Sequence, residues 1–227
     1  LVIARSFLVE GNTNGIVERD FFEALPKDVF EPAVICSDCN MIGGYSKLAY
    51  YPAHESIRLQ NVLAFLGRFG FHGMFQPDLM TFSWAPHAQR KALSLLKTGQ
   101  FDYIHTISYP LASQMVGLKL KMKTGVKWIA QFYEPWVDNF SRGFTRKRFK
   151  EADEAKERLV FEKANVIIHS NKVMADLWIQ RYGKDAARKI EVMPFILRHE
   201  EPYVELGNRN RDGKLNVVHV GHFYGVR

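Results

Sequence analysis

Short apolar runs and longer stretches with helical spacing alternate along this chain of 227 residues. The runs are close to continuous, which is typical of strands buried on both faces of a parallel sheet. We predict strands over residues 1–8, 33–36, 103–107, 128–132, 166–169 and 190–193. Apolar residues at helical spacing predict helices over residues 16–25, 56–69, 87–96, 110–122, 146–164 and 172–182. The segment with Gly43-Gly44 and Tyr50-Tyr51-Pro52 is expected to be a loop, and residues 70–86 have no clear pattern.

Residues with turn or capping preferences mark the ends of these elements. Gly99, Gly125 and Gly183 each follow a predicted helix, where glycine can adopt the left-handed conformation that ends a helix. Asn171 precedes the helix over 172–182 and is a preferred N-cap residue. In the long charged helix, the spacing predicts an inner stripe of Phe149, Ala152, Ala155, Leu159 and Val160.

This order of elements predicts an α/β fold, a Rossmann-like doubly wound parallel sheet with helices on both faces. From 197 to 214 the composition shifts to Glu, Asn, Arg, Gly and Pro, as expected of a linker. A new apolar run, Leu215–Val220, follows it and ends at Gly221. We therefore predict a domain over 1–196, an interdomain linker over 197–214 and the truncated start of a second domain over 215–227.

Composition and charge restrict the class of protein. With 47% hydrophobic and 24% charged residues, the chain is expected to fold around a large core, which excludes disorder and coiled coil. The net charge is +7, and basic residues gather between Arg142 and Lys150. That cluster is either a solvated helix start or a contact for an anionic membrane or acceptor. Because no apolar stretch approaches the ~18–20 residues of a membrane span, we expect a cytoplasmic protein, peripheral on the membrane at most.

The sequence lacks the motifs of several common classes of enzyme. Cys36 and Cys39 form a lone C-x-x-C without further ligands at matching spacing, so a structural role is favoured over a metal or redox site. No catalytic triad order, phosphate-binding P-loop or zinc-protease motif is present. A dehydrogenase is disfavoured because the loop Gly11–Gly15 lacks the dinucleotide fingerprint.

Candidate site residues are those that follow the predicted strands, because ligands of open parallel sheets bind beyond the carboxyl ends of the strands. Gly11–Gly15 is such a loop, where glycine lets a substrate approach the backbone. Tyr133 and Glu134 follow a central strand and are bordered by Trp136, so they are suited to bind sugar hydroxyls and a sugar face. A structural carboxylate with core aromatic residues is the alternative interpretation of this segment.

Two further segments follow strands. His105 lies within its strand and is expected to be a satisfied core histidine, whereas Ser108 and Tyr109 at the strand end are candidates for the crevice. The last segment, Gly221–Arg227, contains a glycine turn after the final apolar run.

In order and spacing, these segments resemble retaining GT-B glycosyltransferases of family 4, also called group 1. Asn14-Gly15-Ile16-Val17-Glu18-Arg19 is similar to the family's Gly-Gly-x-Glu-Arg loop, with Asn14 in place of the first glycine. The stretches that resemble its later motifs are FDYIHT at 101–106, WIAQFYEPW at 128–136, ANVIIHS at 164–170, IEVMP at 190–194 and VHVGHFY at 218–224.

The resemblance implies that this is the acceptor-side N-terminal domain, with the nucleotide-sugar-binding domain missing and the fragment inactive. It implies transfer of a sugar to a polysaccharide, lipopolysaccharide or glycolipid acceptor, without a metal, a cofactor or a nucleic-acid partner. Tyr133 and Glu134 stand where the family has a His-Asp or Asp pair and would be the catalytic residues. The substrate-binding residues implied or suggested by position are Asn14, Gly15, Ser108, Tyr109 and Trp136, and Gly221 and Arg227 would contact the donor diphosphate. The alternative is a Rossmann-like nucleotide- or ligand-binding module without catalytic activity.

Overall fold

The computed structural model describes residues 1–7, 13–37, 48–68, 80–108, 111–139 and 147–194. The elements of this part all fall within one compact unit, Leu1–Leu197. The strands are β1 (Val2–Ile3), β2 (Ala33–Cys36), β3 (Ala49–Pro52), β4 (Tyr103–Ser108), β5 (Lys127–Phe132), β6 (Val166–His169) and β7 (Ile190–Val192). The helices are α1 (Thr13–Ala24), α2 (Ile57–Arg68), α3 (Met80–Ser83), α4 (Ala85–Leu96), α5 (Ala112–Thr124), α6 (Lys147–Lys163), α7 (Lys172–Tyr182) and α8 (Lys184–Ala187). The predicted linker over 197–214 and second domain over 215–227 lie outside the described residues.

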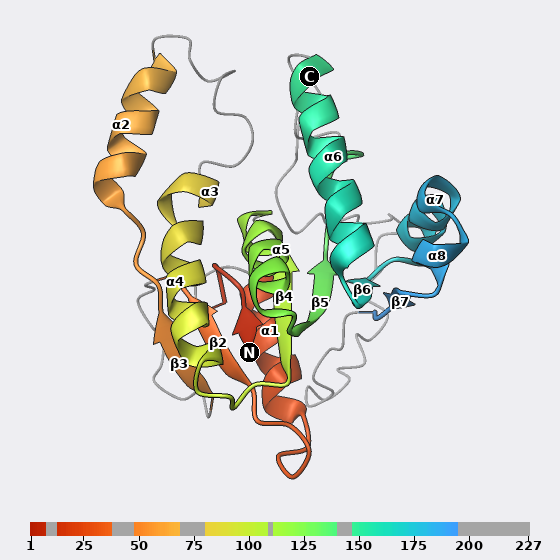
Figure 1. Ribbon diagram of the computed structural model, residues 1–227, viewed down its shortest axis with the longest axis horizontal. Coiled ribbons are helices and arrows are strands. Elements are labelled where there is room, and N and C mark those ends of the chain that lie inside the picture. Colours follow the sequence, from red (N-terminus) through yellow and green to blue (C-terminus); the bar gives the residue numbers. More distant parts are fainter. Residues whose placement is uncertain (8–12, 38–47, 69–79, 109–110, 140–146, 195–227) are drawn as a thin grey trace, which may run out of the picture. The chain divides into compact units, whose positions relative to one another are not determined.

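In the described part of the chain, seven strands form one sheet in the order β3-β2-β1-β4-β5-β6-β7 (Figure 1). Every neighbouring pair is parallel. The chain winds outward from β1 in one direction and from β4 in the other, so the topology reverses between these two strands. The carboxyl ends of all strands lie at one edge, where a doubly wound sheet binds its ligands. The predicted fold class is confirmed.

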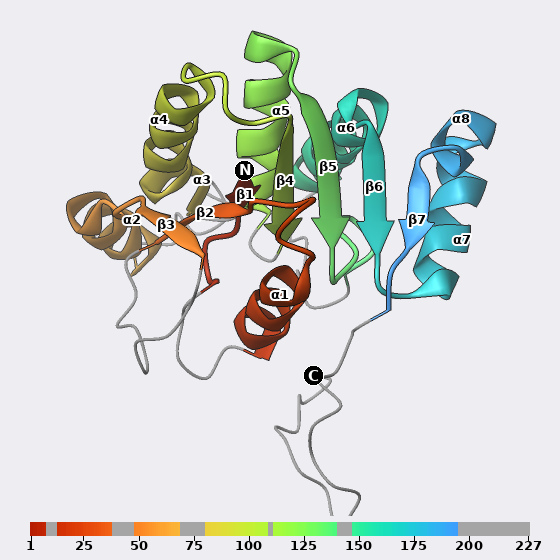
Figure 2. The ribbon, with the colours of Figure 1, turned by 90° about the horizontal axis from the view of Figure 1, so that it is seen from below.

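Helices cover both faces of the sheet (Figure 2). On one face, the main core joins β-strand residues to apolar residues of α4, α5, α6 and α7, among them Ala88, Val116, Val160 and Trp178. The other face carries a smaller cluster, in which Phe22 of α1 packs with residues of β1, β2 and β4. This second face is where α1 brings polar residues next to the end of β5.

Local signals place most element ends as predicted. Gly99 and Gly125 both have φ of 72° and Gly183 has φ of 79°, conformations that glycine adopts without strain. Asn171 caps α7, because its side chain accepts a hydrogen bond from the Val173 amide at 2.7 Å. Residues 80–86, which had no clear sequence pattern, form α3 and the start of α4, with fully buried Trp84 between the two helices.

Three predictions are wrong. The strand predicted over residues 1–8 is only two residues long, Val2–Ile3, and the chain turns at residues 5–7. The segment at Tyr50–Pro52 belongs to β3, which lies at the edge of the sheet, where a strand tolerates a proline such as Pro52. In α6, Ala152, Ala155 and Leu159 are exposed. The residues that α6 buries are Asp153, Glu157, Val160 and Phe161. The helix is therefore rotated from the predicted stripe and takes two carboxylates into the interior.

Candidate functional site

A narrow hollow lies beside α1, where β5 and β7 end. Its lining comes from α1, from the end of β5 and from the residues after β7: Val17, Glu18, Phe21, Phe22, Gln131, Tyr133, Met193 and Pro194. Tyr133 begins the segment that we call the β5 loop, residues 133–139. The hollow therefore lies at the carboxyl edge of the sheet, the edge predicted to hold the site.

Glu18 and Tyr133 form a hydrogen-bonded pair in this hollow. Glu18 is only 5% exposed, and this burial raises the pKa of its carboxyl to about 8, although the Tyr133 hydrogen bond opposes the rise. Burial and the neighbouring Glu18 carboxyl raise the pKa of the Tyr133 phenol. At neutral pH the pair is thus a protonated carboxyl beside a protonated phenol. Tyr133 acts as a neutral hydrogen-bonding group, in a position where the resemblance implied a histidine.

The pair continues into the sheet through two more polar side chains. Gln131 hydrogen-bonds the Tyr133 hydroxyl. The Nε2 of His105 lies 2.8 Å from Oε1 of the same glutamine. Burial lowers the pKa of His105 to about 4, so the ring is neutral, and it packs edge-on against Phe22 of α1 with ring centroids 5.4 Å apart. The expectation that His105 is a satisfied core histidine is confirmed, and a polar chain from His105 to Glu18 supports Tyr133 from behind.

The predicted residues of the β5 loop differ in exposure. Glu134 is exposed, and its Oε2 accepts a hydrogen bond from Nδ2 of Asn139 at 2.8 Å. Trp136 is 1% exposed and packs on Phe132, with ring centroids 6.5 Å apart. Glu134 thus offers a carboxylate to solvent, whereas Trp136 holds the loop on the core. A contact of Trp136 with a sugar stays a prediction.

Among the other predicted site residues, Gly15 is required by the close packing of α1 against a turn. A Cβ at Gly15 would lie 2.6 Å from the Ser6 carbonyl oxygen and 2.9 Å from that of Phe7, so only glycine lets α1 approach this turn. Ser108 is 1% exposed at the end of β4, and its Oγ has no hydrogen-bond partner within the described residues. Outside the described part of the chain lie Tyr109, Gly221, Arg227 and Cys39, and the side chain of Asn14 is not described either.

Sequence reasoning missed Glu18 as a site residue. It lies in the glycine loop motif that was compared with the family, but a glutamate in the first turns of a helix is ordinarily a solvated, favourable residue there. The available signal was its position on the same side of α1 as Phe22, which is buried. Only the packing of α1 against the end of β5 brings it to Tyr133.

The basic cluster is partly neutralised by its own helix. Lys147 lies 3.6 Å from Glu151, and Lys150 lies 3.9 Å from Glu154, in pairs one helical turn apart. The guanidinium of Arg148 lies over the Phe149 ring, 4.8 Å from its centroid. None of the helices in the described residues is long and apolar enough to span a bilayer. The same part of the chain contains no group of three or more His, Cys, Asp or Glu side chains placed to hold a metal ion.

A doubly wound parallel sheet with a hollow at its carboxyl edge is a Rossmann-like fold, the class to which the domains of GT-B glycosyltransferases belong. The chain belongs to Glycosyltransferase Family 4, whose family model matches residues 20–195. A solved structure of sucrose-phosphate synthase from Thermosynechococcus elongatus is similar, with a TM-score of 0.60 and 13% sequence identity over 85% of this chain. The match covers 47% of that protein, so this chain spans about half its length. No match was found among curated proteins.

Proposed function

We propose that this domain forms the acceptor-binding side of a retaining glycosyltransferase that uses a nucleoside-diphosphate sugar. The observation that carries the proposal is the buried Glu18–Tyr133 pair at the ligand-binding edge of a family 4 domain, with the exposed Glu134 as the next residue of the β5 loop. The donor would bind mainly to a second domain. Activity would then require a longer protein that includes that domain; this chain spans about half of the similar structure.

In this proposal, the acceptor hydroxyl oxygen forms a bond to the anomeric carbon while the bond from that carbon to the diphosphate breaks. The acceptor proton passes to the leaving diphosphate, so neither a metal nor a cofactor is required. Glu134 orients the acceptor hydroxyl and favours positive charge that develops on the sugar ring. Tyr133, kept neutral by its surroundings, contributes a hydrogen bond to the substrate rather than a proton transfer.

The proposed roles of the remaining residues are based on their positions along the sequence. Asn14, Ser108, Tyr109 and Trp136 would contact the substrate, and Gly15 would line the donor side of the cleft. Gly221 and Arg227 would contact the donor diphosphate. The acceptor would be a polysaccharide, lipopolysaccharide or glycolipid, and the 142–150 segment would meet an anionic membrane on the cytoplasmic side. Because two of its lysines are already paired with glutamates, that contact would draw mainly on its arginines.

The test uses the native gene expressed in full and a panel of nucleoside-diphosphate sugars, with calorimetry for binding and diphosphate release for turnover. We expect one donor to bind the full protein and to bind the 227-residue chain weakly or not at all. Tight binding by the chain alone, or no donor for the full protein, would contradict the proposal.

Glu134→Gln tests the site itself. Glutamine keeps an oxygen that can accept the Asn139 hydrogen bond, so the loop should stay in place while the negative charge is lost. We expect kcat to fall about a hundredfold with little change in melting temperature. The matched control is Asp176→Asn, which removes an exposed carboxylate of α7 that is paired with Lys172. An unchanged kcat for Glu134→Gln would place the chemistry elsewhere.

A further inference from the structure

A buried carboxylate of α6 holds the backbone of the β5 loop. The side chain of Glu157 is 0% exposed, although α6 is otherwise rich in charge and partly solvated. Its Oε2 accepts the Val137 amide hydrogen at 3.0 Å, and its Oε1 accepts the Tyr182 hydroxyl at 2.5 Å. Arg181 adds a third donor to Oε1 at 3.3 Å. One carboxylate therefore joins the β5 loop, α6 and α7.

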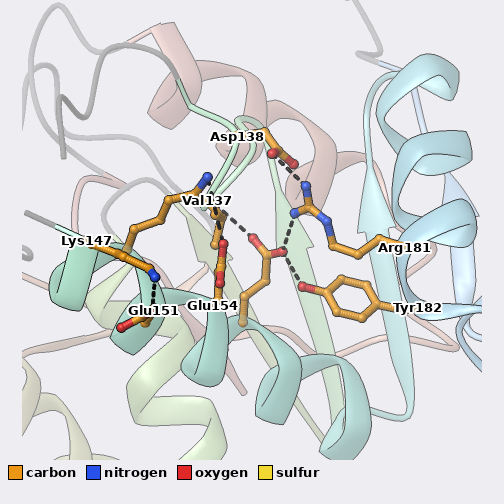
Figure 3. A network of polar contacts seen from close by, with 9 residues as sticks. Val137, Asp138, Lys147, Glu151, Glu154, Arg181 and Tyr182 are labelled. Atoms are coloured by element: carbon orange, nitrogen blue, oxygen red, sulfur yellow. Dashed lines mark hydrogen bonds and ion pairs between the residues drawn. The ribbon is translucent and has the colours of Figure 1, made fainter.

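Arg181 makes a second connection to the same loop. Its Nη2 donates to Oδ1 of Asp138 at 2.6 Å, while its Nη1 faces Glu157. Figure 3 shows Arg181 reaching Asp138 of the loop, with dashed lines marking the contacts of Arg181 and Tyr182. Two consecutive loop residues are thus fixed from α6 and α7, one through its backbone and one through its side chain.

The loop is also anchored on its apolar side. Trp136 packs on Phe132, and Phe132 packs edge-on against Trp178 of α7 with ring centroids 5.2 Å apart. Glu134 lies just before this anchored part, and its carboxylate is tied to Asn139 just after it. The position of Glu134 therefore depends on contacts that α6 and α7 make with residues 136–138.

A gain in folding stability does not by itself explain this network of hydrogen bonds and ion pairs. Taking a carboxylate out of water is costly, and buried ion pairs often add little to stability compared with apolar residues of similar volume. Burial raises the pKa of Glu157, while the bonds from Tyr182 and Val137 and the charge of Arg181 act in the opposite direction. What the carboxylate supplies, and an apolar side chain would not, is a fixed geometry for the Val137 amide.

We propose that Glu157 and Arg181 are positioning residues of the glycosyl transfer, which hold the β5 loop so that Tyr133 and Glu134 face the acceptor. This rests on the function proposed above. Neither residue is expected to touch the substrate. Loss of the contacts should misplace Glu134 and lower the rate of the chemical step more than the binding of the donor.

The first variant is Glu157→Gln. A glutamine amide has one oxygen to accept three donors, and its nitrogen would face groups that donate themselves, so the Val137 amide or one of its neighbours loses its partner. We expect kcat of the full protein to fall about tenfold to a hundredfold, while the donor KM changes less than about threefold. Asp138→Asn, which weakens the Arg181 connection, should have the same effect to a smaller degree.

The matched control is Val160→Ala, a fully buried position of the same helix that lies outside the network. Both variants are assayed at a temperature where each is folded, so that a loss of stability does not lower the amount of folded enzyme in either. Hydrogen–deuterium exchange of the 133–139 segment is measured in parallel. We expect faster exchange at Val137 in Glu157→Gln and unchanged exchange there in Val160→Ala.

The outcomes separate the two proposals. Equal loss of kcat in Glu157→Gln and Val160→Ala, or unchanged kcat in Glu157→Gln, would overturn the positioning role even if the full protein is a glycosyltransferase. If the full wild-type protein transfers no sugar, the proposed function fails and the role in transfer fails with it. Exchange at Val137 would then still decide whether Glu157 fixes the loop, since unchanged exchange in Glu157→Gln contradicts that as well.

Discussion

Replacing Glu18 by glutamine should make the stability of this protein less dependent on pH. Glu18 is 5% exposed, and its pKa rises from 4.5 to about 8 on folding, chiefly through burial. Between these two values, the unfolded chain has lost the Glu18 proton while the folded chain retains it. The folded state therefore binds more protons, and its stability must fall as pH rises through this window.

The size of the effect follows from the same interval. Each pH unit contributes about 1.4 kcal/mol, so Glu18 would cost the folded state up to about 5 kcal/mol above pH 8 relative to pH 4. Water reaching the hollow would lower this figure. Glutamine has nearly the same shape, can accept the Tyr133 hydrogen bond and carries no charge. Glu18→Gln should therefore match the wild type near pH 5 and exceed it increasingly up to pH 8.

The assay is urea unfolding followed by tryptophan fluorescence at pH 5, 6, 7 and 8. The free energies of unfolding of wild type and variant are subtracted at each pH, which cancels contributions from all other titrating groups. Glu31→Gln, at an exposed position, controls for the loss of one carboxylate. A difference that stays flat, or shrinks as pH rises, would refute a buried protonated Glu18.

Two other substitutions test the packing and capping of the fold. Gly117→Ala would place a Cβ 2.5 Å from the Trp128 indole and 2.7 Å from Cγ2 of Thr106, so overpacking between α5 and the sheet should destabilise the protein by about 1–3 kcal/mol, measured by urea unfolding. Unchanged stability would mean that α5 can shift away from β5. Asn171→Ala removes the side-chain acceptor for the Val173 amide and should cost about 1 kcal/mol, seen as a lower melting temperature. Asn171→Asp, which keeps an acceptor, should retain most of that stability, and equal losses in both variants would contradict the capping role.

Local sequence signals predicted the regular elements well. The strands at 33–36 and 166–169 and the helix at 172–182 have the predicted bounds. These signals are short-range: a run of apolar residues, a glycine able to take positive φ, an asparagine able to cap. Their physical causes lie within a few residues, so the sequence contains them without knowledge of the fold.

Predictions that depended on which face of an element is buried were less successful. For α6, apolar spacing favoured Ala152, Ala155 and Leu159, but the structure buries Asp153 and Glu157 instead. A carboxylate can be buried only where donors meet it. The donors to Glu157 come from Val137, Tyr182 and Arg181, which lie 20 or more residues away.

The candidate site shows the same difference between local sequence signals and contacts with distant segments. By itself, the sequence determined a parallel α/β sheet, an edge for the ligand and the β5 loop with Glu134 on it, because strand order and turn chemistry are encoded locally. Only the tertiary structure decided that Glu18 joins Tyr133, that Trp136 lies in the core and that Glu157 holds the Val137 amide. Each of these depends on burial and on partners from distant segments, and those exist only once the chain has folded.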